Sequence, residues 1–164
     1  MATRSNIAVQ QEDGSFLYIY VHNDGYFEGV GQTLLDHYGD IGKARELVAL
    51  GDLSVVGNEI GEKHDFDEPR WDWAVKVKTP ENLARAALVD TWCLAYGRDR
   101  GEENIEPKPL ASTDVLSAYQ NQYLYVMQAD DAGIYTWFTV YHRKLTSLEA
   151  VIAVEAEDDE DDED

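Results

Sequence analysis

The sequence predicts an α+β domain whose sheet is mostly antiparallel and whose helices pack on one face. Three observations lead to this prediction. Hairpin patterns lie near both ends of the chain, helical patterns lie between them, and an acidic run closes the chain. The length of 164 residues and the hydrophobic content of 44% suit one domain with a tail. We expect a single domain over residues 1–154 and a disordered acidic tail over residues 155–164.

Residues 6–22 predict the first hairpin. Two apolar runs flank the turn-forming stretch Glu12-Asp13-Gly14-Ser15. In the run that follows the turn, both sets of alternating side chains are apolar. This pattern favours a central strand that is covered on both faces.

Helix signals follow in the middle of the chain. Apolar residues at helical spacing predict a short helix near residues 29–38, and Asp40 is suited to cap a second helix that ends before Gly51. The stretch Thr79-Pro80-Glu81 predicts the start of another helix, which runs to about residue 90.

The remaining segments predict strands and one ambiguous element. Residues 70–79 alternate between apolar and polar side chains and predict a half-buried strand, whereas residues 51–69 resemble a loop. Residues 91–97 predict another strand. A second hairpin turns at Asp130-Asp131-Ala132-Gly133, and residues 147–154 suit a last helix or a strand. Added to the two hairpins, these strands complete the predicted sheet. On the buried face of the strand in residues 70–79 we expect Trp71, Trp73, Val75 and Val77.

The charge excludes one class of partner. The formal net charge is −20, and nine of the last ten residues are acidic, so the rest of the chain still carries −11. Binding to a phosphate backbone needs clustered Lys and Arg, so we expect no direct contact with nucleic acid. Basic protein surfaces are the expected partners. The acidic residues of the tail are the candidate partner-binding residues: Glu155, Glu157, Asp158, Asp159, Glu160, Asp161, Asp162, Glu163 and Asp164.

Cysteine content and hydropathy indicate a cytoplasmic protein that does not enter a membrane. Cys93 is the single cysteine and lies in an apolar run, which is typical of a small core residue rather than a nucleophile. The N-terminus has no hydrophobic signal region, and no run is long enough to span a bilayer.

Two loops form a candidate site. The segment YGRDRGEE concentrates arginines in a chain with 13 basic residues, and GEKHDFDE places a histidine among carboxylates. Either the arginines pair with acidic residues and hold the two loops together, or they form a small patch that binds an anion or a partner. The candidate residues of this loop site are His64, Asp65, Asp67, Tyr96, Arg98, Asp99 and Arg100.

No motif in the sequence predicts a cofactor, a metal site or a catalytic residue. The stretch GVGQTL lacks the third glycine and the Lys-Ser/Thr ending of phosphate-binding loops. The histidines have no spacing that requires zinc, and no cysteine pair accompanies them. No catalytic arrangement of Ser or Cys with His follows from spacing.

Several stretches together resemble a family of small bacteriophage-encoded proteins of unassigned function: SNIAVQQEDGSFLYIYVHNDGYFEGVGQTLLDHY, ALGDLS, GEKHDF and YGRDRGEE. The resemblance covers residues 5–65 well and residues 94–104 moderately. Family members often carry Cys and Trp where this chain has Val21 and Asn23. The most specific positions are His22, Asp24, Gly25, Tyr26, Gly29, Gly31, Leu34, Leu35 and Tyr38. The resemblance implies a phage origin and supplies no catalytic residue.

These observations favour a non-enzymatic phage protein that binds, and inhibits or redirects, a host nucleic-acid-handling or defence protein. DNA mimicry by the acidic tail is one mechanism for this. One alternative is a protein that binds or transforms a small molecule or nucleotide through the two loops. Another is a phage accessory protein whose tail only provides solubility. The sequence leaves the oligomeric state open.

Overall fold

The computed structural model describes the backbone of residues 2–162 and the side chains of residues 2–157. Over these residues one sheet of eight strands has the order β4-β3-β2-β1-β6-β7-β8, with β5 paired to β2 beside that path. The strands are β1 (Ser5–Gln10), β2 (Phe16–Val21), β3 (Leu53–Val55), β4 (Leu94–Ala95), β5 (Lys108–Leu110), β6 (Tyr123–Ala129), β7 (Tyr135–Tyr141) and β8 (Lys144–Ser147). The helical elements are η1 (Phe27–Gly31), α1 (Gln32–His37), α2 (Ile41–Ala49), η2 (Asp72–Ala74), α3 (Pro80–Asp90), α4 (Tyr96–Arg100), η3 (Ser112–Ala118) and α5 (Leu148–Asp162).

Both predicted hairpins are confirmed. Strands β1 and β2 pair antiparallel, as do β6 and β7. Gly14 in the first turn has a φ of 88° and Gly133 in the second has a φ of 80°. Glycine adopts this left-handed conformation without steric cost, so the turn chemistry fixes both hairpins locally.

The sheet is mixed, which corrects the expectation of a mostly antiparallel one. Strand β1 pairs parallel with β6, so the two hairpins lie side by side, and β2 meets β3 in parallel at Val21 and Leu53. Alternation of apolar residues shows which face of a strand is buried, but it does not show the direction of its neighbour. The mixed pairing therefore had no signal in the sequence.

The predicted helix starts are confirmed. The segment near residues 29–38 forms η1 followed by α1. The Asp40 carboxylate accepts a hydrogen bond from the Lys43 amide at 3.0 Å and caps α2. In the same way, the Thr79 hydroxyl accepts from the Asn82 amide at 3.1 Å and caps α3. Side-chain oxygens thus satisfy amides that have no partner within the first turn of a helix.

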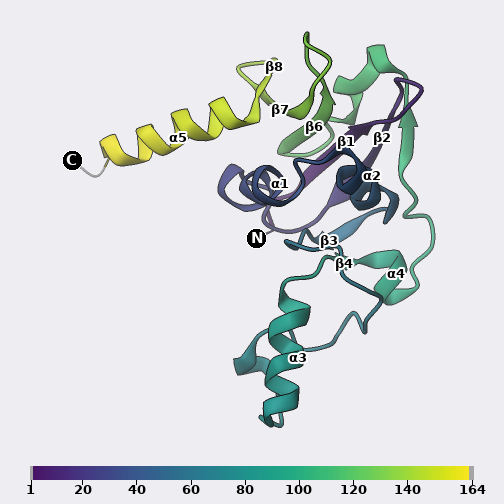
Figure 1. Ribbon diagram of the computed structural model, residues 1–164, viewed down its shortest axis with the longest axis vertical. Helices are drawn as coiled ribbons and strands as arrows, with labels where there is room; N and C mark the ends of the chain where they lie inside the picture. Colours follow the sequence, from purple (N-terminus) through teal and green to yellow (C-terminus); the bar gives the residue numbers. More distant parts are fainter. Residues whose placement is uncertain (1, 163–164) are drawn as a thin grey trace.

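Different helical elements cover the two faces of the sheet (Figure 1). Helices α1, α2 and α5 contribute Leu34, Leu47 and Leu148 to the main core, on the face that includes Ile7 of β1. The 3₁₀ segment η3 packs on the opposite face, beside Phe16 of β2. Helices α1, α2 and α5 therefore share one face of the sheet, and β2 is covered on both faces. Helix α3, which was expected on the same face, instead projects beyond β4.

The strand predicted over residues 70–79 is wrong. Residues 72–74 form the 3₁₀ turn η2, and only Val75 among the four expected core residues is buried. Trp71, Trp73 and Val77 are exposed by 53%, 73% and 63%. A segment with an alternating pattern becomes a stable strand only where a neighbouring strand pairs with it. Within the described chain, the structure places no strand beside these residues.

Two shorter predictions are also corrected. Residues 91–97 form only the two-residue strand β4 before α4 begins at Tyr96. The segment read as a loop from Gly51 contains the three-residue strand β3. Elements this short fall within the usual error of a boundary inferred from a pattern.

Helix α5 replaces most of the tail that the sequence predicted as disordered. Its first turns are anchored by Leu148 and Val151, and it continues through Asp162. Extending an anchored helix costs less than nucleating one, and the Ala and Glu residues at its centre favour helix. Glu163 and Asp164 lie outside the described residues.

Two elements project from the sheet (Figure 1). The "α5 arm", residues 153–162, leaves the sheet beyond the buried turns of α5. The "α3 arm", residues 67–91, carries η2 and α3 and lies beyond β4 at another end of the molecule. No helix in the described residues has the length and apolar character that crossing a membrane requires.

Two buried phenols make the fold sensitive to alkaline pH. The Tyr38 and Tyr125 hydroxyls each donate a hydrogen bond of 2.6 Å to a backbone carbonyl, that of Gly57 and of Gly25. Burial raises the pKa of both phenols above the usual value of about 10. Because the folded chain favours the neutral phenols, their contribution to stability is complete below pH ~10 and is lost at higher pH.

We therefore expect cooperative unfolding above about pH 10, followed by circular dichroism. The phenolate absorbance of Tyr38 and Tyr125 at 295 nm should appear only as the chain unfolds. Titration of all ten tyrosines in a chain that keeps its native spectrum would contradict this expectation.

Candidate functional site

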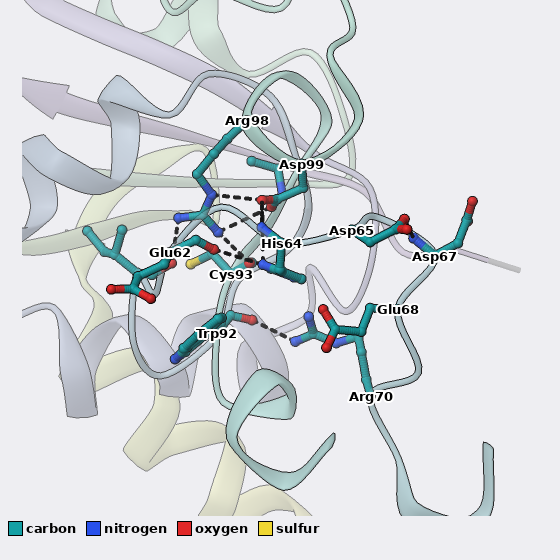
Figure 2. A network of polar contacts seen from close by, with 12 residues as sticks. Glu62, His64, Asp65, Asp67, Glu68, Arg70, Trp92, Cys93, Arg98 and Asp99 are labelled. Carbon is teal, nitrogen blue, oxygen red and sulfur yellow. Dashed lines mark hydrogen bonds and ion pairs between the residues drawn. The ribbon is translucent and has the colours of Figure 1, made fainter. Parts of the chain in front are cut away.

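The Asp99 carboxylate is the centre of the candidate loop site (Figure 2). Its Oδ1 accepts hydrogen bonds from the His64 amide at 3.1 Å and from Arg98 Nε at 3.0 Å. Its Oδ2 accepts from the Ala95 amide at 2.8 Å and from Arg98 Nη2 at 3.2 Å. The carboxylate is fully buried. A buried charge requires this kind of pairing, because it has lost its hydration.

The Arg98 guanidinium links the two loops. Beyond Asp99, its Nη1 donates to the Ile60 carbonyl at 2.8 Å and its Nη2 to the Cys93 carbonyl at 2.9 Å. One side chain thus ties the loop after β3 to the segment that enters β4. This geometry favours the structural interpretation of Arg98, as a residue that holds the loops together, over the patch interpretation.

His64 lies in the same network with no exposed side-chain surface. Its Nδ1 is 2.8 Å from the Glu62 carbonyl and donates to it, and it lies 3.5 Å from Asp99 Oδ1. Nε2 is buried without a hydrogen-bond partner among the described residues, and the ring packs edge-on against Trp92 at 5.5 Å. The ring therefore presents neither nitrogen at the surface of the molecule.

Arg70 and Trp92 belong to the network although no spacing in the sequence pointed to them. Arg70 Nη2 donates to the Trp92 carbonyl at 2.6 Å and to the Asp90 carbonyl at 3.2 Å. Burial lowers the pKa of the Arg70 guanidinium, and the nearby Asp90 carboxylate partly offsets this. Arg85 lies over the Trp92 ring at 5.2 Å and pairs with Glu68 at 2.7 Å. These contacts attach the α3 arm to the sheet.

Glycines allow the loop to pack directly on Trp92. A Cβ atom at Gly57 would overlap the Trp92 backbone, and one at Gly61 would overlap the indole. Gly61 also has a φ of 72°, which other residues rarely adopt. Glycine is therefore needed at both positions. In the sequence, these glycines indicated only a loop.

Tyr96 and Arg100 form a separate group at the surface. Phe66 stacks on Tyr96 with ring centroids 5.5 Å apart, and the Arg100 guanidinium lies 4.7 Å from the Phe66 ring and 5.1 Å from the Tyr96 ring. Arg100 also pairs with Glu102 at 2.6 Å. Both predicted arginines thus have acidic partners within the structure.

Asp65 and Asp67 do not join the network. Asp65 Oδ1 accepts from the Asp67 amide at 3.0 Å in a local turn, and both residues are exposed. Of the seven loop candidates, only Asp67 borders the hollow of about 490 Å³ beneath α3. Among the described residues, no group of three or more His, Cys, Asp or Glu side chains is placed to hold a metal ion.

The tail candidates lie on the α5 arm. Glu155 is half-buried and Glu157 is exposed. The backbone of α5 carries Asp158, Asp159, Glu160, Asp161 and Asp162, whereas Glu163 and Asp164 fall outside the described residues.

Exposed tryptophans are the feature that sequence reasoning missed. Trp71 and Trp73 stack with ring centroids 5.8 Å apart and planes 5° apart. Their alternation with polar residues predicted that both side chains face the core, so the sequence pattern gave no sign of their exposure. The one contrary signal was the position of this segment between a loop-like stretch, residues 51–69, and a predicted helix from Thr79, which left such a strand without an evident neighbour.

Comparisons with protein-family models, with curated proteins and with solved structures found no match. The resemblance to small phage proteins therefore stays a prediction.

Replacing Asp99 should destabilise the fold strongly. Asp99→Asn leaves the half-buried Arg98 guanidinium without its counter-ion and removes a buried acceptor of two backbone amides, and we expect a loss of about 3 kcal/mol in the free energy of unfolding. Urea denaturation followed by fluorescence measures this. The control is Glu102→Gln, which removes the exposed pair with Arg100 and should cost less than about 1 kcal/mol. Equal effects of the two variants would show that the buried pair does not hold the loops.

Proposed function

We propose that this chain is a non-enzymatic phage protein that occupies the basic, nucleic-acid-binding surface of a host protein, by DNA mimicry through the α5 arm. The partner is a nucleic-acid-handling or defence protein of the host cytoplasm, which the binding inhibits or redirects. The observation that carries the proposal is the density of acidic residues along α5.

The spacing of charge on α5 resembles that of duplex DNA. Seven of the eight residues at positions 155–162 are Asp or Glu. An α-helix rises about 1.5 Å per residue, so these eight residues extend about 12 Å and carry one acidic residue per ~1.7 Å of axis. Duplex DNA carries one phosphate charge per about 1.7 Å of its axis. A row of Lys and Arg that fits a DNA backbone therefore meets a similar charge density on α5.

The helix end itself favours a cationic partner. The C-terminus of an α-helix carries a partial negative charge, and cations stabilise it. The last turn of α5 holds no basic residue. A partner that supplies Lys or Arg relieves this unfavourable arrangement, so binding and helix stability reinforce one another.

The rest of the chain supports the same class of partner. Outside the tail the formal charge is still −11, which attracts a basic protein over a longer range and repels nucleic acid. The loop candidates support the small-molecule alternative less well. The side chains of His64 and Asp99 are buried, and Arg98 uses its nitrogens within the network.

Neutralising the acidic residues of the α5 arm should strongly weaken the binding of the partner. In the tail variant, the seven acidic residues of positions 155–162 become Asn or Gln in the full-length chain. If each exposed pair contributes about 0.5 kcal/mol, the affinity for a captured host protein should fall roughly a few hundredfold. The partner is identified by affinity capture and mass spectrometry, and its affinity for the purified chain is then measured by titration calorimetry. Duplex DNA should compete with the wild-type chain for it.

A matched control separates the α5 arm from net charge. The control variant removes seven exposed acids of the body by amide substitution and should bind within about tenfold of wild type: Glu28, Glu62, Glu81, Glu103, Glu106, Asp114 and Asp131. Equal losses in both variants would mean that total charge, rather than α5, drives association. If wild type captures no protein at all, the tail serves solubility alone and the proposal fails.

A further inference from the structure

The exposed tryptophans lie on a part of the chain that differs from the rest in charge. The α3 arm contains five acidic and four basic residues, a formal charge of −1 in a chain of −20. Trp71 and Trp73 are exposed by 53% and 73%, and Val77 and Leu88 on the same arm by 63% and 50%. Large apolar side chains gathered on a projecting, nearly neutral surface are typical of a contact with another molecule.

The tryptophans are held on a rigid support. Trp71 precedes η2, and its carbonyl accepts from the Ala74 amide at 3.0 Å. Next to it, Arg70 is buried and bonded to the carbonyls of Asp90 and Trp92. The two indoles lie nearly parallel, at 5°. Their outer surfaces are thus presented in a fixed orientation, which lowers the entropic cost of binding.

From these observations we propose that Trp71, Asp72 and Trp73 form a binding site for arginine side chains of the basic partner. Indole faces attract guanidinium groups, and Arg stacks on them better than Lys does. Asp72 lies between the two tryptophans in the sequence, is exposed, and forms no ion pair with the described residues. The exposed Asp72 carboxylate offers a hydrogen-bond acceptor of the kind that a stacked guanidinium requires.

The same arm already uses this interaction internally. Arg85 lies over the ring of Trp92 at 5.2 Å, and Arg100, near the base of the arm, lies over Phe66 at 4.7 Å. The hollow of about 490 Å³ on this arm is lined by the apolar side chains of Val75, Val77 and Ala86 and by residues of both charges: Asp67, Glu68, Lys76 and Arg85.

The charge of the whole chain decides between arginine and nucleic acid as occupant. Stacked aromatics with nearby lysines also suit unpaired bases, and Lys76 and Lys78 are exposed on this arm. A net charge of −20 opposes any polyanion and favours a polycation. This site rests on the proposed function, since it adds a second contact to the same basic partner.

The test uses two peptides of equal charge, nona-arginine and nona-lysine, titrated into the full-length chain by calorimetry. Indole N–H resonances in NMR spectra report on the tryptophans. Wild type should bind nona-arginine more tightly and shift the signals of Trp71 and Trp73. The double variant Trp71→Leu/Trp73→Leu should bind nona-arginine about tenfold more weakly and lose the preference for arginine. Asp72→Asn should reduce the preference in the same direction. Both variants should retain the wild-type circular dichroism spectrum, because the substituted side chains are exposed.

Controls distinguish this site from α5. The tail variant should weaken binding of both peptides equally and keep the preference for arginine. If it does so while the double tryptophan variant binds like wild type, the proposed function stands and the arginine site is overturned. If the tryptophan variant loses binding and the tail variant does not, the arginine site stands and the role of α5 fails.

Two further results would overturn the arginine site. The variant Lys76→Gln/Lys78→Gln should bind nona-arginine at least as well as wild type. Binding of a dT15 oligonucleotide that is lost in this lysine variant would instead assign the indoles to nucleic acid. Self-association of wild type that is abolished by the tryptophan substitutions would assign them to a second copy of the chain.

Discussion

The buried pair of Asp99 and Arg98 is the constraint on which one end of this molecule depends. The loop between β3 and α3 has little regular pairing of its own: an isolated bridge joins Glu59 to Trp92, and the Phe66 amide donates to the Asp99 carbonyl. Its path is set chiefly by one carboxylate and one guanidinium, which bond to backbone groups on both sides. An ion pair with a buried carboxylate gains little over an apolar pair of similar volume, but either partner left alone is strongly destabilising. Because the α3 arm is attached through this loop, the pair also determines where the exposed tryptophans lie.

Local chemistry in the sequence was enough to predict the parts of the fold that depend on neighbouring residues. The two hairpin turns need glycine at Gly14 and Gly133, and the caps at Asp40 and Thr79 need only residues three positions away. The parallel pairing of β1 with β6 joins segments more than 100 residues apart, and no periodicity records it. The prediction of a strand around Trp73 was wrong for a related reason. Its alternation suits a strand, but no neighbouring strand is present to pair with it.

The candidate site was predictable in part. The pairing of Arg98 with Asp99 follows from one of the two interpretations, in which the arginines pair with acidic residues and hold the two loops together. The hydrogen bond from the His64 amide to Asp99 was not predicted. Which carboxylate is buried depends on packing rather than on residue type. The sequence therefore did not show that Asp99 is buried whereas Asp65 and Asp67 are exposed. The Arg70 guanidinium joins the network by donating to the backbone carbonyls of Asp90 and Trp92. Every residue has a backbone carbonyl, so no residue type in the sequence indicates such a contact.

Helix α5 begins at Leu148, immediately after β8 ends at Ser147, without an intervening loop. Flexible acidic tails sample many conformations and lose that freedom when they bind, at a cost of about 1–2 kcal/mol for each backbone residue that becomes ordered. A helix that continues directly from a sheet strand has met most of this cost during folding. Its direction relative to the sheet is also fixed, so it can enter a groove of one shape and is excluded from others. In the proposed complex, the junction between β8 and α5 therefore gives a stretch of low sequence complexity geometric selectivity for its partner.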